Sequence, residues 1–306
     1  MSLGNKGILL VLFTALVSGF AIFINSFGIK GFEPSVFTFS KNVVVAVLLF
    51  FIILGAGNFV ELKYLRPKQW FKLILIGLIG GSTPFLLFFN GLKMSAGTTS
   101  AFIHKTIFIY VAIFAIIFLK EKLTKSLFVG AVLLLAGNYF MIIPDFSFSL
   151  GHLFVFMATV MWAAENTLSK HVLKELSGTV VAFGRMFFGS VFILIFLLFT
   201  GKLKLVLSMS KAQYSWILLT AMFLLLYVFS YYNGLKYIKV TTAACILSLG
   251  SPITTILSWI FSGKPIFVHQ AVGMFLIAIG VIIIIWLAQL SSNATYPARV
   301  KHNGWH

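Results

Sequence analysis

A few charged side chains interrupt the long apolar stretches of this 306-residue chain. They are Lys41, Lys105, Glu165 and Arg185, and the titratable His104 lies next to Lys105. A charged group inside a membrane costs about 2.5–3.5 kcal/mol on insertion scales, so such residues mark ligand pathways, proton relays or paired charges. We therefore treat these five residues as candidates for ligand binding and coupling.

Glu165 and Arg185 fall at similar depth in neighbouring predicted helices, counted at about 1.5 Å per residue. This placement predicts an ion pair, which serves either as a structural clamp or as a gating or coupling pair that breaks during a conformational change. Glu165 is the one acid that we place in a helix interior. It is therefore the first candidate for carrying a proton, and His104 is the second.

Lys41 and Lys105 have no acid at matching depth, and both fall about 10 Å below the outer surface at the same rise per residue. Each ammonium either receives a carboxylate or phosphate of a substrate or extends to the membrane surface. Adjacent residues point about 100° apart on a helix, so His104 and Lys105 do not face one spot.

One helix face carries an aromatic and three polar groups at spacings of three, four and seven residues: Trp162, Glu165, Asn166 and Ser169. Such a face suits the lining of a cavity. We expect it to be met by a second set, Tyr227, Ser230, Tyr231 and Asn233, while Tyr232 and Tyr237 near the helix end belong to an interfacial aromatic belt.

Two prolines interrupt apolar stretches and each removes a backbone hydrogen bond. Pro84 and Pro252 are candidate hinges beside a cavity, because the carbonyls they free need partners within a membrane. The nearby Gly77 and Gly81 form a pair of small residues that favours close helix packing. The candidate gating or coupling residues are thus Glu165, Arg185, Pro84 and Pro252. The candidate substrate-binding residues are Lys41, His104, Lys105, Trp162, Glu165, Asn166, Arg185, Tyr227 and Tyr231.

The elements that position these residues follow from composition. The chain is 60% hydrophobic and 9% charged, against about 25% charged in soluble domains, which indicates an integral, multi-pass membrane protein. The net charge of +17 resides mostly in short gaps between apolar runs, which argues against a nucleic-acid partner and for a lipid bilayer. Ten transmembrane helices are predicted, at 6–28, 35–56, 71–93, 97–119, 125–143, 151–172, 178–200, 212–235, 240–262 and 267–288.

An internal repeat organises these helices. The sequence NGLKMSAGTTSAFI at Asn90–Ile103 returns as NGLKYIKVTTAACI at Asn233–Ile246, with eight of fourteen positions identical. We expect Thr98, Thr99, Thr241 and Thr242 to cap the helices that follow. The units predicted are residues 1–143 as a first five-helix repeat, 151–288 as a second, and 289–306 as a polar tail.

Five helices is an odd number, so the second repeat must cross the membrane in the opposite direction, giving an all-α, inverted-topology protein. With a cytoplasmic N-terminus, the inner segments hold fourteen Lys or Arg residues and the outer segments hold six. This bias predicts that both termini are cytoplasmic. Secondary transporters with such repeats bind substrate near the membrane midplane, between the halves.

These features resemble the EamA-type drug/metabolite transporter superfamily. The resemblance rests on the repeated NGLK-to-TTSA junction, on the run Phe118–Thr124 (FLKEKLT) and on Gly130 and Gly137. It implies a prokaryotic plasma-membrane carrier of a small metabolite such as an amino acid, organic anion or amphiphile, working by alternating access. In the second repeat the FLKEKLT turn has Lys264 in place of its acid, so the function of that glutamate is not shared by both halves.

Other functions find less support in the sequence. No HExxH, GxSxG or nucleotide-binding loop is present, and one interior acid cannot form a catalytic carboxylate pair. We therefore expect no enzyme activity, no cofactor and no metal site, and leave a channel or membrane enzyme as the alternatives. Coupling to protons and the oligomeric state are left open.

Overall fold

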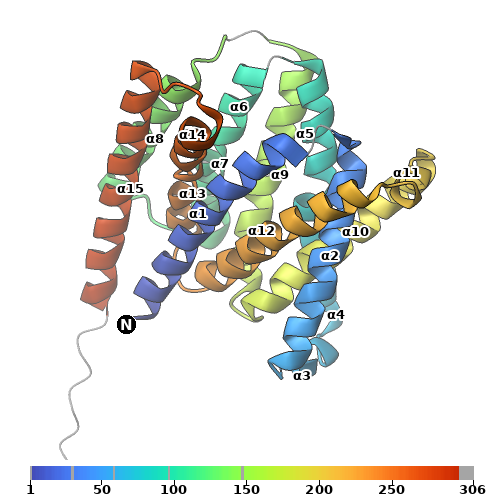
Figure 1. Ribbon diagram of the computed structural model, residues 1–306. Coiled ribbons are helices and arrows are strands. Elements are labelled where there is room, and N and C mark those ends of the chain that lie inside the picture. The colour runs from blue at the N-terminus through green and yellow to red at the C-terminus, as the bar shows by residue number, and fades with distance from the viewer. Residues whose placement is uncertain (1, 29–30, 58, 96, 146–147, 296–306) are drawn as a thin grey trace, which may run out of the picture.

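The computed structural model describes residues 2–28, 31–57, 59–95, 97–145 and 148–295, with side chains described as far as residue 286. The described chain is a bundle of helices without strands (Figure 1). In chain order the elements are α1 Leu3–Gly28, α2 Pro34–Gly55, α3 Phe59–Lys63, α4 Pro67–Ile76, the π-helical turn η2 Gly77–Ser82, α5 Thr83–Met94, α6 Gly97–Lys105, α7 Ile107–Leu119, α8 Lys125–Ile142, α9 Leu150–Val172, α10 Gly178–Phe199, α11 Leu203–Leu207, α12 Lys211–Leu235, α13 Val240–Leu247, α14 Gly250–Ser262 and α15 Val268–Thr295.

Each predicted apolar segment is helical in the structure, although some are divided into two or three elements. Within the described residues, nine stretches are long and apolar enough to cross a membrane, with α4, η2 and α5 forming one stretch and α6–α7 and α13–α14 forming two more. The helix α9 has the length of a span but is not among the nine. It carries Glu165, Asn166 and Lys170, so the least apolar long helix is the one with the candidate site.

Local signals at the helix ends explain why the apolar runs stop where they do. Glu33 precedes Pro34 and accepts hydrogen bonds from the N–H groups of Ser35 (2.7 Å) and Val36 (3.1 Å), which caps α2. Thr124 caps α8 by accepting from the Leu127 N–H at 3.2 Å. These acceptors satisfy backbone donors that a helix leaves unpaired in its first turn.

The fifth helices of the two repeats, α8 and α15, lie side by side in antiparallel orientation (Figure 1). A Cβ on Gly137 would lie 2.8 Å from the Gly273 carbonyl oxygen, and a Cβ on Gly130 would lie 3.1 Å from that of Gly280. Glycine at these four positions lets the two backbones approach closely. The order of the contacts, with 137 against 273 and 130 against 280, fixes the antiparallel direction.

Other contacts also join a helix of one repeat to a helix of the other. Each of them has a counterpart in which the two repeats exchange roles. The helix α1 packs on α12, and the corresponding α9 packs on α5, while α2 pairs with its counterpart α10. Glycines lie at both exchanged contacts. A Cβ on Gly7 would lie 3.0 Å from the Gly234 carbonyl oxygen, and a Cβ on Gly91 would lie 2.6 Å from that of Gly151. The two halves are therefore related by an approximate two-fold axis.

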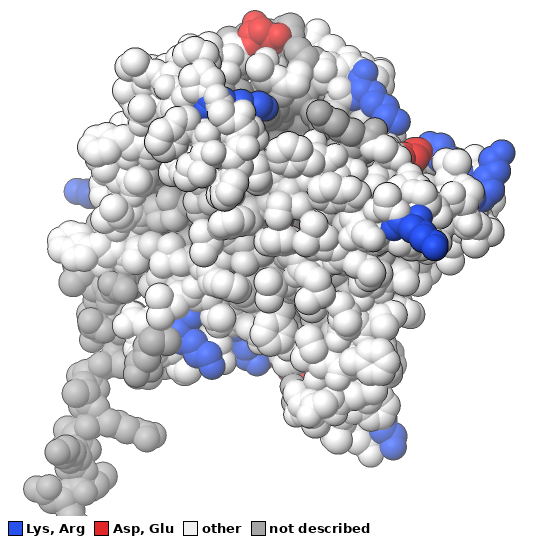
Figure 2. All heavy atoms as spheres, viewed as in Figure 1, with Lys and Arg blue, Asp and Glu red and all other residues white. Residues whose placement is uncertain are grey.

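Charge is confined largely to the two ends of the bundle. Figure 2 shows Lys, Arg, Asp and Glu gathered toward the top and bottom of this face, with a nearly uncharged band between them. The start of α1 and the end of α15 lie at the same end, which is the lower one in Figure 1. The helices of this band are long and apolar enough to cross a membrane, so the interior charges described next are the exception.

The expected threonine caps are not formed as predicted at the second junction. The N-cap of α13 is Lys239, and its first N–H, from Val240, donates to Oε1 of Glu121 at 3.0 Å. The Thr241 hydroxyl donates to Oε2 of the same carboxylate at 2.7 Å. The glutamate of the FLKEKLT turn thus caps a helix of the other repeat, which is a tertiary contact that no local pattern encodes.

Candidate functional site

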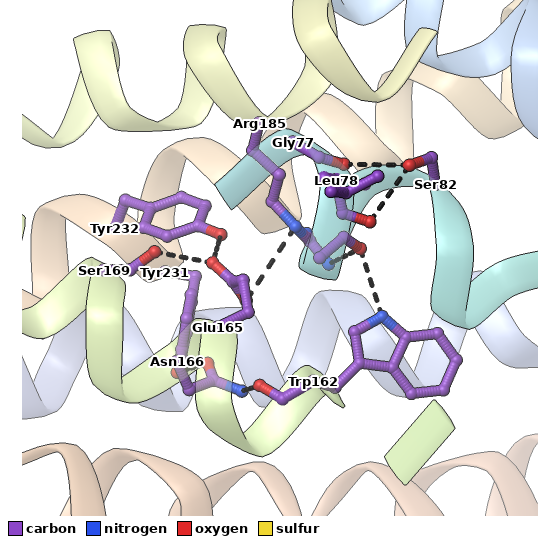
Figure 3. A network of polar contacts seen from close by, with 12 residues as sticks. Gly77, Leu78, Ser82, Trp162, Glu165, Asn166, Ser169, Arg185, Tyr231 and Tyr232 are labelled. Atoms are coloured by element: carbon purple, nitrogen blue, oxygen red, sulfur yellow. Dashed lines mark hydrogen bonds and ion pairs between the residues drawn. The ribbon is translucent and has the colours of Figure 1, made fainter. Parts of the chain in front are cut away.

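An ion pair lies buried between α9 and α10. Glu165 is 2% exposed and Arg185 is 8% exposed, and Arg185 Nε lies 4.0 Å from Glu165 Oε2 (Figure 3). The predicted pairing of these two residues is therefore present in the structure. The separation exceeds the 2.7–2.9 Å of a charge-assisted hydrogen bond, so the two charges attract without a direct bond between them.

The other oxygen of the Glu165 carboxylate is held by two hydroxyl groups. Ser169, one turn further along α9, donates to Oε1 at 2.6 Å, and Tyr232 on α12 donates at 2.7 Å. Tyr232 is fully buried, so its assignment to an interfacial belt was wrong. Its ring faces α9 instead of lipid, and a buried hydroxyl takes the acceptor that is available there.

The carbonyl oxygen of Gly80 is the second anchor of the site. It accepts from Arg185 Nη2 at 3.0 Å and from Trp162 Nε1 at 3.1 Å. The α-helical donor for this carbonyl would be the N–H of residue 84, which is a proline and has none. Pro84 and the π-helical turn before it thus leave a backbone acceptor for side chains of the other repeat.

Glycines bring this turn against α10. A Cβ on Gly81 would lie 2.4 Å from the Arg185 carbonyl oxygen, and one on Gly77 would lie 2.4 Å from Phe188 Cβ. Close packing is therefore the role of Gly77 and Gly81, as the sequence predicts. Asn42 on α2 adds a bond from Nδ2 to the Gly81 carbonyl at 2.9 Å. The turn η2 is thus contacted by α2, α9 and α10.

The predicted polar face of α9 extends beyond Glu165. Asn166 donates from Nδ2 to the Trp162 carbonyl at 2.8 Å, and its Oδ1 accepts the hydroxyl of Tyr231 on α12. Tyr227 stacks on Tyr231 with ring centroids 5.9 Å apart. The structure therefore brings together Trp162, Glu165, Asn166, Arg185, Tyr227 and Tyr231 from the predicted site.

Two residues expected on this face point elsewhere. Ser230 hydrogen bonds with Thr14 on α1 at 2.8 Å, and Asn233 lies against the start of α10, with Nδ2 3.5 Å from Thr179 Oγ1. Their positions on α12, one residue before and two after Tyr231, turn them away from the Tyr231 face because successive helix residues are about 100° apart.

His104 approaches the same site from α6. Its ring centroid lies 5.0 Å from that of Trp162 and 5.2 Å from that of Phe88, and its Nδ1 is buried without a hydrogen-bond partner. Among the described residues Lys105 makes no hydrogen bond or ion pair. Lys41 contacts Asn25 Oδ1 at 3.4 Å and the Phe37 ring at 4.6 Å, so its contacts lie on α1 and α2.

The fourth helix is broken in both repeats, at equivalent places. The helix α6 ends at Lys105 and α7 begins at Ile107, while α13 ends at Leu247 and α14 begins at Gly250. With the repeat offset of 143 residues, Ile107 corresponds to Gly250. Paired discontinuous helices are typical of substrate sites in carriers with inverted repeats. No proline or glycine marks the first break. Pro252 lies beyond the second break, and its counterpart in the first repeat is Ile109.

A separate charged contact lies at the upper end of the bundle. Lys202 Nζ lies 2.7 Å from Glu33 Oε1, joining the start of α2 to the segment before α11. Partial burial raises the pKa of the Glu33 carboxyl, but hydrogen bonds from Lys202, Ser35 and Val36 outweigh this effect and lower the pKa to about 2. Glu33 is therefore ionised at neutral pH.

Within the described part of the chain, no three His, Cys, Asp or Glu side chains gather as metal ligands would. The polar groups of the hydrogen-bonded network are instead two charges, four hydroxyl or amide groups, the Trp162 indole N–H and a backbone carbonyl. Such a set can bind, orient and exchange protons with a small ligand. Sequence reasoning missed Tyr232 and Gly80. The missing N–H of Pro84, four residues after Gly80, was the signal for the second.

Comparison with known proteins agrees with this arrangement. The chain matches the EamA-like transporter family twice, over residues 5–143 and 149–286, and it belongs to that family. It is a multi-pass integral membrane protein whose relatives are bacterial.

Two curated relatives carry transporter names. The uncharacterized transporter YyaM of Bacillus subtilis (strain 168) is 27% identical over 282 residues, covering 87% of this chain and 91% of the relative. The uncharacterized inner membrane transporter YhbE of Escherichia coli (strain K12) is 24% identical over 187 residues, covering 58% of each chain. One crystal structure superposes with a TM-score of 0.75 over 94% of this chain and 99% of that one, and at 16% identity it shows the fold alone.

Proposed function

We propose that this protein is a secondary transporter that moves a small metabolite by alternating access between two inverted five-helix repeats. The observation that carries the proposal is the buried network around Glu165 and Arg185. Gly80 of the first repeat accepts bonds from Trp162 and Arg185 of the second, so the charges lie where the two halves meet. Interior charges in a membrane are functional sites by default.

The two ends of the bundle offer contacts that a rocking motion would break in turn. At the lower end Glu121 of the first repeat binds the start of α13 in the second. At the upper end Glu33 of the first repeat binds Lys202 of the second. We propose that opening toward one side separates one of these contacts while the other persists. Ten spans with both termini in the cytoplasm complete the proposed topology.

The substrate is a small molecule, and amino acids, organic anions and amphiphiles are the classes to test. Lys41, His104 and Lys105 lie outside the direct hydrogen bonds of the network and extend the proposed binding region. Glu165 is the proposed proton carrier, since it is buried and reaches groups of three helices. The competing functions are a channel and a membrane enzyme, and the assay described next distinguishes them from a carrier.

Purified protein in liposomes tests the proposal. A carrier shows saturable uptake and counterflow of labelled metabolites, whereas unsaturable flux indicates a channel and conversion of the compound indicates an enzyme. Glu165→Gln should abolish uptake driven by a pH gradient while counterflow persists. The matched control is Glu175→Gln, because Glu175 is an acid at the lower end that pairs with Lys72. Unchanged pH dependence in Glu165→Gln would remove Glu165 from coupling.

A further inference from the structure

We propose that the transported compound is a monocarboxylate with an apolar, planar body, that Arg185 receives its carboxylate, and that Glu165 takes up one proton as it binds. This inference rests on the proposed carrier function, because it names the substrate class and the coupling of the same site. It follows from three features of the network. Arg185 has hydrogen-bond donors that are not used, other residues hold Glu165 and Arg185 apart, and the charges of the two side chains cancel.

The first feature is the unused hydrogen-bonding capacity of Arg185. A guanidinium has five N–H donors in a fixed fork that matches a carboxylate. In the described structure Arg185 makes one hydrogen bond, from Nη2 to the Gly80 carbonyl, and its Nε is buried without a partner. Buried donors are nearly always satisfied in proteins, so the unused N–H groups of this cation are available to a ligand carboxylate.

The second feature is that the pair is held apart. Ser169 and Tyr232 anchor Oε1 of Glu165, while the Gly80 carbonyl anchors Nη2 of Arg185. The gap of 4.0 Å between Nε and Oε2 is therefore set by bonds on either side of it. An incoming carboxylate can take the free part of the guanidinium without first breaking a direct bond to Glu165.

Spare donors outnumber spare acceptors around the gap. On the donor side, Nε of Arg185 has no hydrogen-bond partner and only one N–H of its guanidinium is used, by the Gly80 carbonyl. On the acceptor side, Gly80 already accepts two bonds, and Asn166 Oδ1 accepts the Tyr231 hydroxyl. Glu165 Oε2 is what remains for an ammonium group, which needs up to three acceptors. The site thus favours an anion over a zwitterion.

Aromatic rings cluster around Trp162, which shares the Gly80 carbonyl with Arg185. The Trp162 ring lies 5.1 Å from Phe85, 5.5 Å from Phe88 and 5.0 Å from His104, measured between centroids. Tyr227 and Tyr231 stack on the α12 side. Offset and edge-to-face contacts with such rings favour a planar apolar ligand. All of these side chains are packed together here, so a ligand enters only when the two halves separate.

The third feature is charge balance. One negative and one positive charge make the buried pair neutral, and a bound monocarboxylate would leave an uncompensated negative charge in a medium of low dielectric. A proton on Oε2 of Glu165 restores neutrality. The other titratable groups around the pair are Tyr227, Tyr231 and Tyr232 on α12, and His104 of α6 contacts Trp162 of the same network. Of these, His104 is the competing proton acceptor.

Three matched probes test the inference on the purified full-length protein: 3-phenylpropionate, its neutral amide, and the zwitterion phenylalanine. Titration calorimetry in two buffers of different ionisation enthalpy measures affinity and protons taken up. We expect 3-phenylpropionate to bind about 10- to 100-fold more tightly than the amide, as a charge-assisted bidentate contact requires. Its binding should take up about one proton at pH 7, by the charge balance above.

Three variants assign the groups. Arg185→Gln should remove the preference for the carboxylate over the amide, and the doubly neutral Glu165→Gln/Arg185→Gln should do the same if the single variant does not fold. Glu165→Gln should bind 3-phenylpropionate without proton uptake. Proton uptake that is lost in His104→Gln but kept in Glu165→Gln would overturn the assignment to Glu165.

Several results would overturn the substrate class. They are equal binding of acid and amide, tighter binding of phenylalanine, a preference that survives Arg185→Gln, or no binding of any probe at 10 mM (a concentration of about that size detects even millimolar affinities). Saturable counterflow of some other compound, together with any of these, would retain the transporter and reject the carboxylate site.

Discussion

Replacing Gly80 with alanine should destabilise the protein, because this position has no room for a methyl group. A Cβ on Gly80 would lie 2.3 Å from Glu165 Cγ, 2.9 Å from Glu165 Cδ and 3.1 Å from Arg185 Nε. Ordinary contacts between carbon atoms are about 3.5–4.0 Å, so Glu165 must move by roughly 1 Å. Its carboxylate cannot move freely, since Ser169 and Tyr232 hold it.

The expected change in the free energy of unfolding combines two costs with one gain. Overpacking of this kind costs about 1–3 kcal/mol, and weakening of the bonds to the Gly80 carbonyl adds about 1–2 kcal/mol. Replacement of a helical glycine by alanine returns up to about 1 kcal/mol. We therefore expect a net loss of about 1–5 kcal/mol in the free energy of unfolding.

Thermal unfolding of the detergent-solubilised protein, at one fixed scan rate, measures the difference. The matched control is Gly55→Ala at the end of α2, where a Cβ meets nothing within 4 Å. The control should be neutral or slightly stabilising, and Gly80→Ala should unfold at a temperature lower by several degrees. Equal midpoints for the two variants would refute the reasoning that Gly80 is needed for the approach of Glu165 and Arg185.

Three further perturbations address other contacts. Glu121→Ala should cost about 0.5–2 kcal/mol in unfolding free energy, as loss of a helix cap does, because Val240 at the start of α13 loses its acceptor; an unchanged midpoint would contradict this. Tyr232→Phe should cost about 1.5–3 kcal/mol, the value of a hydrogen bond to a charged group, and a neutral effect would place the hydroxyl outside the network. The folded-state pKa of Glu33, about 2, lies below its ordinary value of 4.5, so its stabilising contribution is complete above pH 4.5 and is lost as the pH falls toward 2. The difference in unfolding temperature between wild type and Glu33→Gln should shrink over that range, and a constant difference would exclude the effect.

Much of the fold could be predicted from the sequence because its main determinants are local. Apolar runs and their flanking polar residues set the helix ends, so the prediction of 125–143 is close to the observed Lys125–Ile142. The repeat offset aligned Gly130 with Gly273 and Gly137 with Gly280. It did not show that Gly137 packs on Gly273, because that contact depends on the direction of the two helices.

Sequence could predict the charged residues of the candidate site, because a charge inside an apolar helix is unusual. It could not predict the uncharged residues as well. Glu165 and Arg185 could be paired from depth alone. Tyr232 was misplaced because a tyrosine near a helix end satisfies the statistics of an interfacial belt as well as those of a buried donor. The break after Lys105 has no proline or glycine to announce it, and there the Thr106 N–H is shared between the Phe102 and Ile103 carbonyls, each at 3.2 Å.

The glycine contacts between α8 and α15 have a consequence for how the molecule can be divided. Gly137 packs against Gly273, which is the counterpart of Gly130 in the other repeat, and Gly130 packs against Gly280, the counterpart of Gly137. Each half therefore carries both components of this seam, which makes the seam self-complementary in the manner of an isologous dimer interface. Two identical halves packed in opposite orientation would therefore form both glycine contacts. A protein made of two copies of one repeat would therefore form the same glycine contacts without further changes to the sequence. The same holds for two fragments separated between α8 and α9.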